Sequence, residues 1–144
     1  MPQNFFNEVQ KAQIVKAIQA AELNSSGEIR LHIEKNCPKP NVLDRAKEVF
    51  QEIGMTNTAQ QNGVLFYLAV EDRKFAVIGD KGIDKVVPDD FWESTKELLK
   101  SHFSQGLFTE GFIKAIHLAG EQLKHYFPYQ KDDTNELPDE ISFG

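Results

Sequence analysis

The sequence predicts one α/β layered domain, and three observations lead to this fold class. The chain has 144 residues, which suffices for one domain with a single hydrophobic core. An alternating segment at 28–34 and a continuous apolar segment at 63–70 are typical of strands, and a third strand pattern follows at 74–78. Helical patterns precede, separate and follow these strands, which favours helices packed on a sheet.

The first helix is predicted over residues 4–23, because its apolar residues recur at helical spacing. An Asn-Ser-Ser-Gly segment then ends it. Residues 28–34 alternate strictly, with apolar side chains on one face and charged or polar side chains on the other. This pattern is typical of a half-buried strand that lies near a sheet edge or beneath a polar helix face.

Asn41 is predicted to cap a second helix, which carries Asp44 in its first turn and ends at Gly54. The apolar segment 63–70 is typical of a central strand that is covered on both faces. Three residues separate it from 74–78, so these two strands form an antiparallel hairpin. The first two strands are expected to be parallel, because a helix joins them in a right-handed crossover.

Pro88 is predicted to start a third helix, since proline suits the first turn and Asp89 and Asp90 favour the positive end of the helix dipole. Thr109 is predicted to cap a fourth helix. The last residues, 129–144, are polar and acidic without any periodicity. We therefore expect a flexible tail there.

The composition excludes several classes of protein. A net charge of -6 argues against nucleic-acid binding, which needs clustered Lys and Arg. The single cysteine, Cys37, cannot form an internal disulfide, and its polar neighbours indicate a surface loop. The sequence has neither a signal-peptide pattern nor an apolar run long enough to span a membrane. We expect a cytoplasmic monomer, and no protein partner can be named.

The predicted sheet divides the polar residues between two edges, which a strand of this length separates by roughly 20 Å. The C-terminal ends of the first two strands carry Glu34, Asn36, Glu71, Asp72 and Arg73. The opposite edge carries Ser26, Glu28, Asn62, Gly63, Gly79, Asp80, Gly82, Asp84, Asp89 and Asp90. Ligands of open α/β sheets usually bind at the first edge, but solvation of charged residues in a hairpin turn is the favoured explanation for Glu71, Asp72 and Arg73.

The second edge has the denser set of carboxylates. Asp80, Asp84, Asp89 and Asp90 come from one loop, and Glu28 is expected to approach from the neighbouring strand. Hard cations such as Ca²⁺ and Mg²⁺ prefer such oxygen ligands. A turn followed by an acid-capped helix is the structural alternative, and it explains Asp89 and Asp90 better than it explains the other two. Anion binding is disfavoured, because the loop lacks phosphate-loop spacing and its negative charge repels phosphate.

Five motifs in order resemble the TPM domain family, whose name refers to a thylakoid lumen protein, a photosystem II protein and a receptor modulator. The motifs are Ser26-Gly27-Glu28-Ile29, Asn62-Gly63-Val64-Leu65, Glu71-Asp72-Arg73-Lys74, Gly79-Asp80-Lys81-Gly82-Ile83-Asp84 and Gly106-Leu107-Phe108-Thr109-Glu110-Gly111-Phe112. Relative to the family pattern, Asp84 replaces a Glu and Glu71 replaces an Asp, so the charge is kept.

The resemblance implies a three-layer α/β/α sandwich with a small mixed twisted sheet and about four helices. It implies a TPM-like domain over 1–128, followed by a flexible acidic tail over 129–144. Plant members are linked to photosystem II repair and acid phosphatase activity. Many members carry a secretion signal and a membrane anchor, patterns that this sequence does not show.

Our first hypothesis is a binding module for Ca²⁺ or Mg²⁺ with a regulatory or protein-interaction role. Its metal ligands would be drawn from Glu28, Asp80, Asp84, Asp89, Asp72 and Glu71. The alternative is a metal-dependent phosphatase acting on phosphate monoesters, in which the metal activates water. A third possibility is an interaction domain whose acids are solvated turns.

Overall fold

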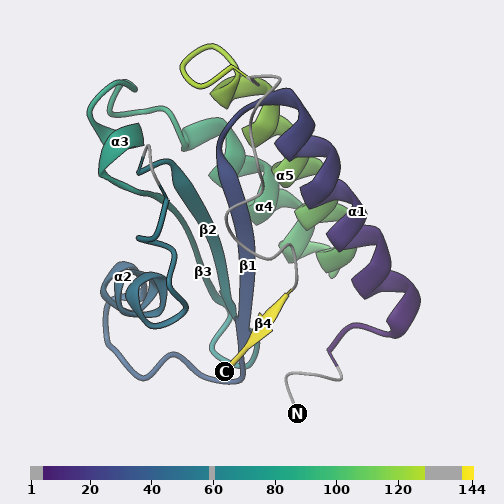
Figure 1. Ribbon diagram of the computed structural model, residues 1–144. Helices are drawn as coiled ribbons and strands as arrows, with labels where there is room; N and C mark the ends of the chain where they lie inside the picture. The colour runs from purple at the N-terminus through teal and green to yellow at the C-terminus, as the bar shows by residue number, and fades with distance from the viewer. Residues whose placement is uncertain (1–4, 59–60, 129–140) are drawn as a thin grey trace.

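The computed structural model describes residues 5–58, 61–128 and 141–144, which form an α/β/α sandwich (Figure 1). In chain order the elements are α1 (Glu8–Asn24), β1 (Glu28–Glu34), α2 (Val42–Glu52), β2 (Gly63–Ala69), β3 (Lys74–Gly79), α3 (Lys81–Asp84), α4 (Glu93–Ser104), α5 (Phe108–Leu123) and β4 (Ser142–Phe143). Helices α1, α4 and α5 cover one face of the sheet, and α2 covers the other. The predicted fold class is confirmed.

Within the described residues the sheet has four strands in the order β3-β2-β1-β4. Strands β1 and β2 are parallel along their whole length, from the pair Glu28 and Gly63 to the pair Glu34 and Ala69. Strand β3 runs antiparallel to β2, as the short connection predicts. The predicted central position of β2 is confirmed, because each of its seven residues is buried.

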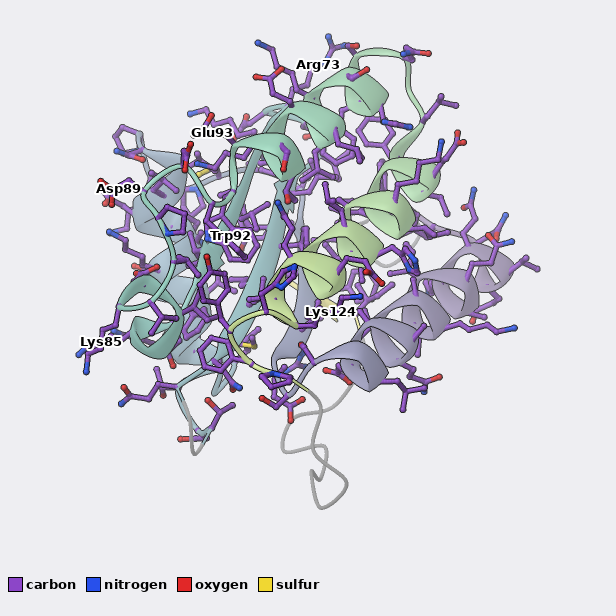
Figure 2. The ribbon with its side chains drawn as sticks, turned by 90° about the horizontal axis from the view of Figure 1, so that it is seen from above. Arg73, Lys85, Asp89, Trp92, Glu93 and Lys124 are labelled. Atoms are coloured by element: carbon purple, nitrogen blue, oxygen red, sulfur yellow. The ribbon has the colours of Figure 1, made fainter. Side chains whose placement is uncertain are left out.

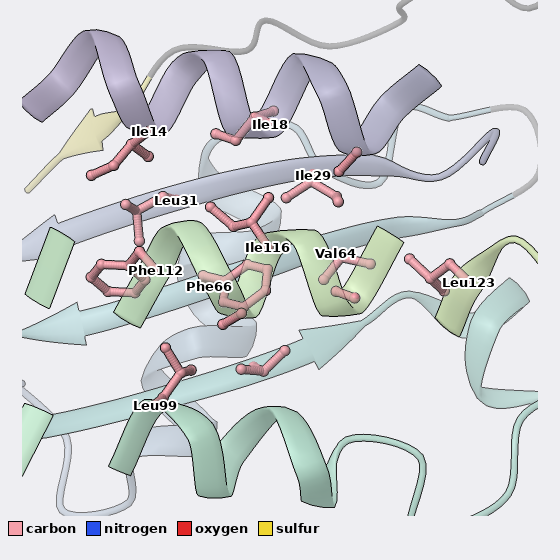
Figure 3. Packing of buried hydrophobic residues seen from close by; sticks show 14 of the residues in the cluster. Ile14, Ile18, Ile29, Leu31, Val64, Phe66, Leu99, Phe112, Ile116 and Leu123 are labelled. Atoms are coloured by element: carbon pink, nitrogen blue, oxygen red, sulfur yellow. The ribbon is translucent and has the colours of Figure 1, made fainter. Parts of the chain in front are cut away.

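The larger core lies between the sheet and the three helices on its first face (Figure 3). Ile29 and Leu31 of β1 point into it, and so do Val64 and Phe66 of β2. The helices contribute Ile14, Ile18, Leu99, Phe112, Ile116 and Leu123. Burial of a large apolar side chain stabilises a fold by about 1.5–3 kcal/mol, so this core holds the three helices on one face.

A smaller core lies beneath α2. Ala46, Val49 and Phe50 of the helix pack against residues of β2 and β3 such as Leu65 and Ala76. Asn41 caps this helix as predicted, with its side chain accepting a hydrogen bond from the backbone of the first turn. The apolar side of α2 therefore packs over β2 and β3, and the helix reaches the polar face of β1 through Arg45, which hydrogen-bonds Glu34.

The helix starts after β3 differ from the prediction. Helix α4 begins at Glu93 rather than at Pro88, and no side chain caps it. The capping aspartate is instead Asp80, which precedes the short helix α3. Thr109 lies inside α5, which begins at Phe108 without a side-chain cap, so its predicted capping role is wrong.

The expected flexible tail over 129–144 differs from the structure at its end. Ser142 and Phe143 form β4, which pairs in parallel with His32 and Ile33 of β1. Residues 129–140 of the predicted tail lie outside the described residues. Strand β1 is therefore interior over part of its length, and it is not the half-buried strand that alternation predicts. No helix in the described ranges has the length and apolar character needed to cross a membrane.

Candidate functional site

The polar residues gather at two separate ends of the sheet, as predicted. The first, which we call the α3 end, consists of Glu28, Asn62, Gly63, Asp80 and Asp84 at the start of β1 and β2 and the end of β3. The second, the hairpin end, surrounds the turn between β2 and β3 at the opposite end of the strands (Figure 1). Figure 2 shows Arg73 of this turn well apart from Lys85 and Asp89.

Backbone hydrogen bonds hold α3 against the loop before β2. The amide of Asp80 donates to the carbonyl oxygen of Gly63 at 2.9 Å, and the amide of Gly82 donates to Gln61 at 2.8 Å. Gly79 allows α3 to turn back over the strand, since a Cβ there would lie 3.2 Å from three side-chain atoms of Ile83. Close packing of this turn places the two aspartates of α3 at a defined position.

Glu28, Gly63 and Asp80 lie in one row across three strands. Glu28 is paired with Gly63 in the register, and Gly63 is bonded to Asp80. All three face the α2 side, because their strand neighbours Ile29, Val64 and Gly79 face the other side, where Ile29 and Val64 join the first core and a Cβ on Gly79 would meet Ile83 of that core. Since adjacent strands lie about 4.8 Å apart, the backbones of Glu28 and Asp80 are separated by roughly 10 Å, with a glycine between them.

Asp80 and Asn62 at the α3 end each have a buried oxygen atom without a hydrogen-bond partner among the described residues. One is Oδ2 of Asp80, whose other oxygen accepts from the Lys81 amide at 2.7 Å. The second is Oδ1 of Asn62, whose side-chain nitrogen donates to the carbonyl oxygen of Ser26 at 3.0 Å. Buried oxygens without partners are costly to desolvate, so both are candidates for a ligand.

Asp84 lies one helical turn after Asp80. Burial raises the pKa of the Asp84 carboxyl, the charge of Asp80 raises it further, and Lys47 of α2 acts in the opposite direction. The two aspartates therefore repel each other, and this repulsion is only partly offset by the lysine.

No group of three or more His, Cys, Asp and Glu side chains within the described part of the chain is arranged to hold a metal ion. The oxygen chemistry of the α3 end nevertheless fits a hard cation, because it supplies carboxylates and an amide oxygen. The carbonyl oxygen of Met55 is a further donor, and it lies 3.1 Å from the position of a Cβ at Gly63. A cation here would need these neutral oxygens, or water, beside the carboxylates.

The structure does not bring the other predicted ligands to the α3 end. Asp89 is exposed in the turn before α4, and no ion pair or hydrogen bond joins its side chain to the α3 end among the described residues. Asp72 lies at the hairpin end, where its Oδ2 accepts a hydrogen bond from the Cys37 amide at 2.6 Å. Glu71 forms an exposed ion pair with Lys35 at 3.8 Å. Glu71 and Asp72 cannot share one ion with Asp80, because a strand length separates the two ends.

Comparison with known protein families and solved structures identifies the family of this chain. The TPM domain description matches residues 1–122. The chain belongs to the TPM domain family. It is 49% identical to the BA42 protein from the psychrophilic bacterium Bizionia argentinensis, with a TM-score of 0.92 over 97% of this chain and 96% of BA42.

Two more distant structures share the fold of this TPM domain. The N-terminal domain of cg2496 from Corynebacterium glutamicum is 12% identical with a TM-score of 0.64, over 94% of this chain and 78% of that one. The N-terminal domain of a P. gingivalis protein is 16% identical with a TM-score of 0.67, over 87% and 82%. Comparison with curated proteins finds no match.

The TPM domain also contains a buried polar cluster that alternation alone did not predict. Glu34 is only 6% exposed, and both of its oxygens accept hydrogen bonds from Arg45 of α2. The hydroxyl of Tyr67 donates to the same carboxylate. Beside it, Nδ1 of His32 lies 2.7 Å from the hydroxyl of Ser142. We call Glu34, Arg45, Tyr67, His32 and Ser142 the Glu34 cluster.

Opposing effects act on the pKa values of this cluster. Burial raises the pKa of the Glu34 carboxyl, but hydrogen bonds from Arg45 and Tyr67 outweigh it, so the net pKa is lowered. Burial lowers the pKa of His32, and the charge of Glu34 only partly opposes this. These groups tie α2, β1, β2 and β4 together, so we assign them a structural role.

Proposed function

We propose that this TPM domain binds a divalent cation, Ca²⁺ or Mg²⁺, at the α3 end. Two observations on Asp80 and Asp84 carry the proposal. The carboxylates lie one helical turn apart and repel each other, and Oδ2 of Asp80 lacks a hydrogen-bond partner among the described residues. A cation between them would relieve the repulsion and satisfy the buried oxygen.

Further oxygens near this pair support the proposal. Glu28 lies in the same cross-strand row as Asp80, and the carbonyl oxygen of Met55 approaches the glycine between them. Asn62 offers a buried amide oxygen from the adjacent loop. Since few carboxylates contribute, water would complete the coordination, and we expect a dissociation constant on the order of 10⁻⁴–10⁻³ M.

A bound cation would change both the conformation and the charge of the α3 end. It would link α3 and the end of β3 to the start of β1, and it would reduce the negative charge that the aspartates present to solvent. A change of this kind suits a regulatory or protein-interaction module. It needs no bound substrate and no catalytic group.

The test is a titration of the ¹⁵N-labelled protein with Ca²⁺ and with Mg²⁺, followed by backbone amide NMR. We expect saturable shifts at Gly63 and over 79–84, and we expect Asp80→Asn to weaken them at least tenfold. Asp89→Asn is the matched control and should bind like the wild type, because Asp89 is exposed in the next turn and is not one of the proposed ligands. Amides at 79–84 that stay unmoved at millimolar cation would overturn the proposal.

The phosphatase alternative has no comparable support among the described residues. Arg73, an arginine that could hold a phosphate, lies at the hairpin end, a strand length from Asp80. Phosphatase activity therefore stays a prediction. An assay with a phosphate monoester and added Mg²⁺ tests it, because metal-assisted hydrolysis at the α3 end must fall in Asp80→Asn.

A further inference from the structure

A second site is suggested by a pocket at the hairpin end, far from the proposed cation site. It has a volume of about 450 Å³ and lies between the turn of β2 and β3, the end of α4 and the start of α5. Its walls include Leu68, Phe75, Phe103 and Phe108, and its polar lining includes Arg73 and Lys100. Ligand pockets in proteins commonly enclose roughly 300–1,000 Å³, so the pocket can take a small molecule.

The apolar wall is built from aromatic rings that hold one another in place. Phe75 and Phe103 meet edge to face at 5.3 Å, and Phe103 and Phe108 stack at 5.0 Å between ring centroids. All three rings are only partly buried in the protein, so they leave apolar surface at the pocket. At its mouth, a Cβ on Gly106 would meet no atom within 4 Å, which shows that this side is open. An apolar molecule that enters would gain contact with preformed ring surfaces.

The two cations of the lining, Arg73 and Lys100, have no ion-pair partner in the part of the chain that the structure describes. The acids next to Arg73 are engaged, since Glu71 pairs with Lys35 and Asp72 accepts from the Cys37 amide. In a protein with a net charge of -6, this leaves a local positive pair at the rim of an apolar pocket.

The backbone of Arg73 is a second, independent observation. Its φ of 55° lies in the left-handed region, which favours glycine or asparagine over a residue with a long side chain. A turn of this kind would be more stable with glycine. An arginine at a strained position is consistent with a function for its side chain.

We propose that the pocket binds a small organic carboxylate with an apolar acyl or aryl body. The body contacts the three phenylalanines, and the carboxylate lies between Arg73 and Lys100. The guanidinium group of Arg73 can donate two parallel hydrogen bonds to a carboxylate, and Lys100 adds a second positive charge. This ligand class is independent of the cation proposed for the α3 end.

Backbone amide NMR with three small-molecule probes tests the site. It also shows whether the pocket prefers an acyl or an aryl body on the carboxylate. Decanoate carries an acyl chain and a carboxylate, decanol carries the same chain without the charge, and 3-phenylpropionate carries an aryl body with the carboxylate. We expect decanoate or phenylpropionate, each below its micellar concentration, to shift amides over 68–75 and 100–108, and the tighter of the two identifies the body. Decanol should bind at least tenfold more weakly than decanoate.

Variants separate binding from stability. Arg73→Gly should weaken carboxylate binding about fivefold while the protein unfolds at the same or a higher temperature, because glycine suits the backbone. Lys100→Gln should weaken binding by a similar factor, and Lys96→Gln, one turn earlier on α4 and outside the lining, should not. Equal binding of decanoate and decanol, shifts confined to other parts of the chain, or undiminished binding by both Arg73→Gly and Lys100→Gln would each overturn the proposal.

Discussion

His32 and Ser142 join strands that are 110 residues apart in the sequence, with Nδ1 of the imidazole 2.7 Å from the serine hydroxyl. The imidazole is also stacked on Tyr67, with 12° between the ring planes, and its Nε2 lies 3.7 Å from Glu34. Because His32 is buried in this cluster, its protonation is coupled to the docking of β4 and to the stability of the whole fold.

Stability should therefore fall as the pH drops below neutrality. Burial lowers the pKa of folded His32 below its unfolded value of 6.5, so the unfolded chain binds the proton more readily. This contribution is complete above about pH 6.5 and is lost as the pH falls toward the folded pKa. Urea unfolding at pH 7.5 and 5.5 should show a smaller loss in His32→Asn than in the wild type. The exposed residue His117 provides the control, because His117→Asn should keep the wild-type pH dependence.

Arg45 should be much more important to stability than a surface arginine. Its removal in Arg45→Met leaves the carboxylate of Glu34 buried and without its main partner, and we expect a loss of about 3 kcal/mol in the free energy of unfolding. Lys47→Met, on the exposed side of the same helix, should cost under about 1 kcal/mol. The measurement is chemical denaturation at pH 7.

A double variant shows whether the loss of stability in Arg45→Met comes from the unpaired, buried carboxylate of Glu34. In Glu34→Gln/Arg45→Met no buried carboxylate remains, so the loss should be smaller than the sum of the two single losses. Additive losses would mean that the two residues stabilise the fold independently, contrary to the ion pair described above.

Sequence patterns predicted the parts of this fold that depend on local periodicity. The crossover through α2 made β1 and β2 parallel, and the apolar run of β2 placed it at the centre. Strand β4 was not predicted, because a strand of two residues has no detectable periodicity and its pairing with His32 and Ile33 is long-range. Alternation likewise identified the polar face of β1 but not its burial, which depends on Arg45 and Ser142 arriving from distant segments.

The candidate site was predicted in part for the same reason. Asp80 and Asp84 were placed at the correct end of the sheet, but capping was assigned to Asp89 and Asp90. Helix α3 has four residues, which is too short to leave a helical period in the sequence. The signal that could have found it is the Asp80 cap followed by an apolar residue, Ile83, that packs against Gly79.

Gly120 should tolerate no larger residue, although it lies inside a helix. A Cβ there would come within 2.9 Å of the Cβ of Ala21 on α1. Gly120→Ala normally favours a helix by about 1 kcal/mol, so a net loss of about 1–3 kcal/mol would reveal the crowding between α1 and α5. Thermal unfolding measures the loss. The compensating variant Ala21→Gly/Gly120→Ala moves the missing methyl to the other helix and should recover part of it.

Asp84→Asn should stabilise the protein when no cation is present. Burial and the charge of Asp80 raise the pKa of Asp84, so its ionised form is unfavourable in the folded state, and this penalty is present at pH 7 and disappears as the carboxyl is protonated in acid. Because the Asp84 side chain is only partly desolvated and much of it remains in contact with solvent, we expect a gain of only a few tenths of a kcal/mol, which salt reduces further. Thermal unfolding in EDTA at low ionic strength measures this gain, with Asp89→Asn as the control that shows no gain.

Adding Ca²⁺ should raise the unfolding temperature of the wild type and leave that of Asp84→Asn nearly unchanged, so the order of stability of the two proteins reverses. A wild type that is already the more stable of the two in EDTA would contradict the repulsion between Asp80 and Asp84.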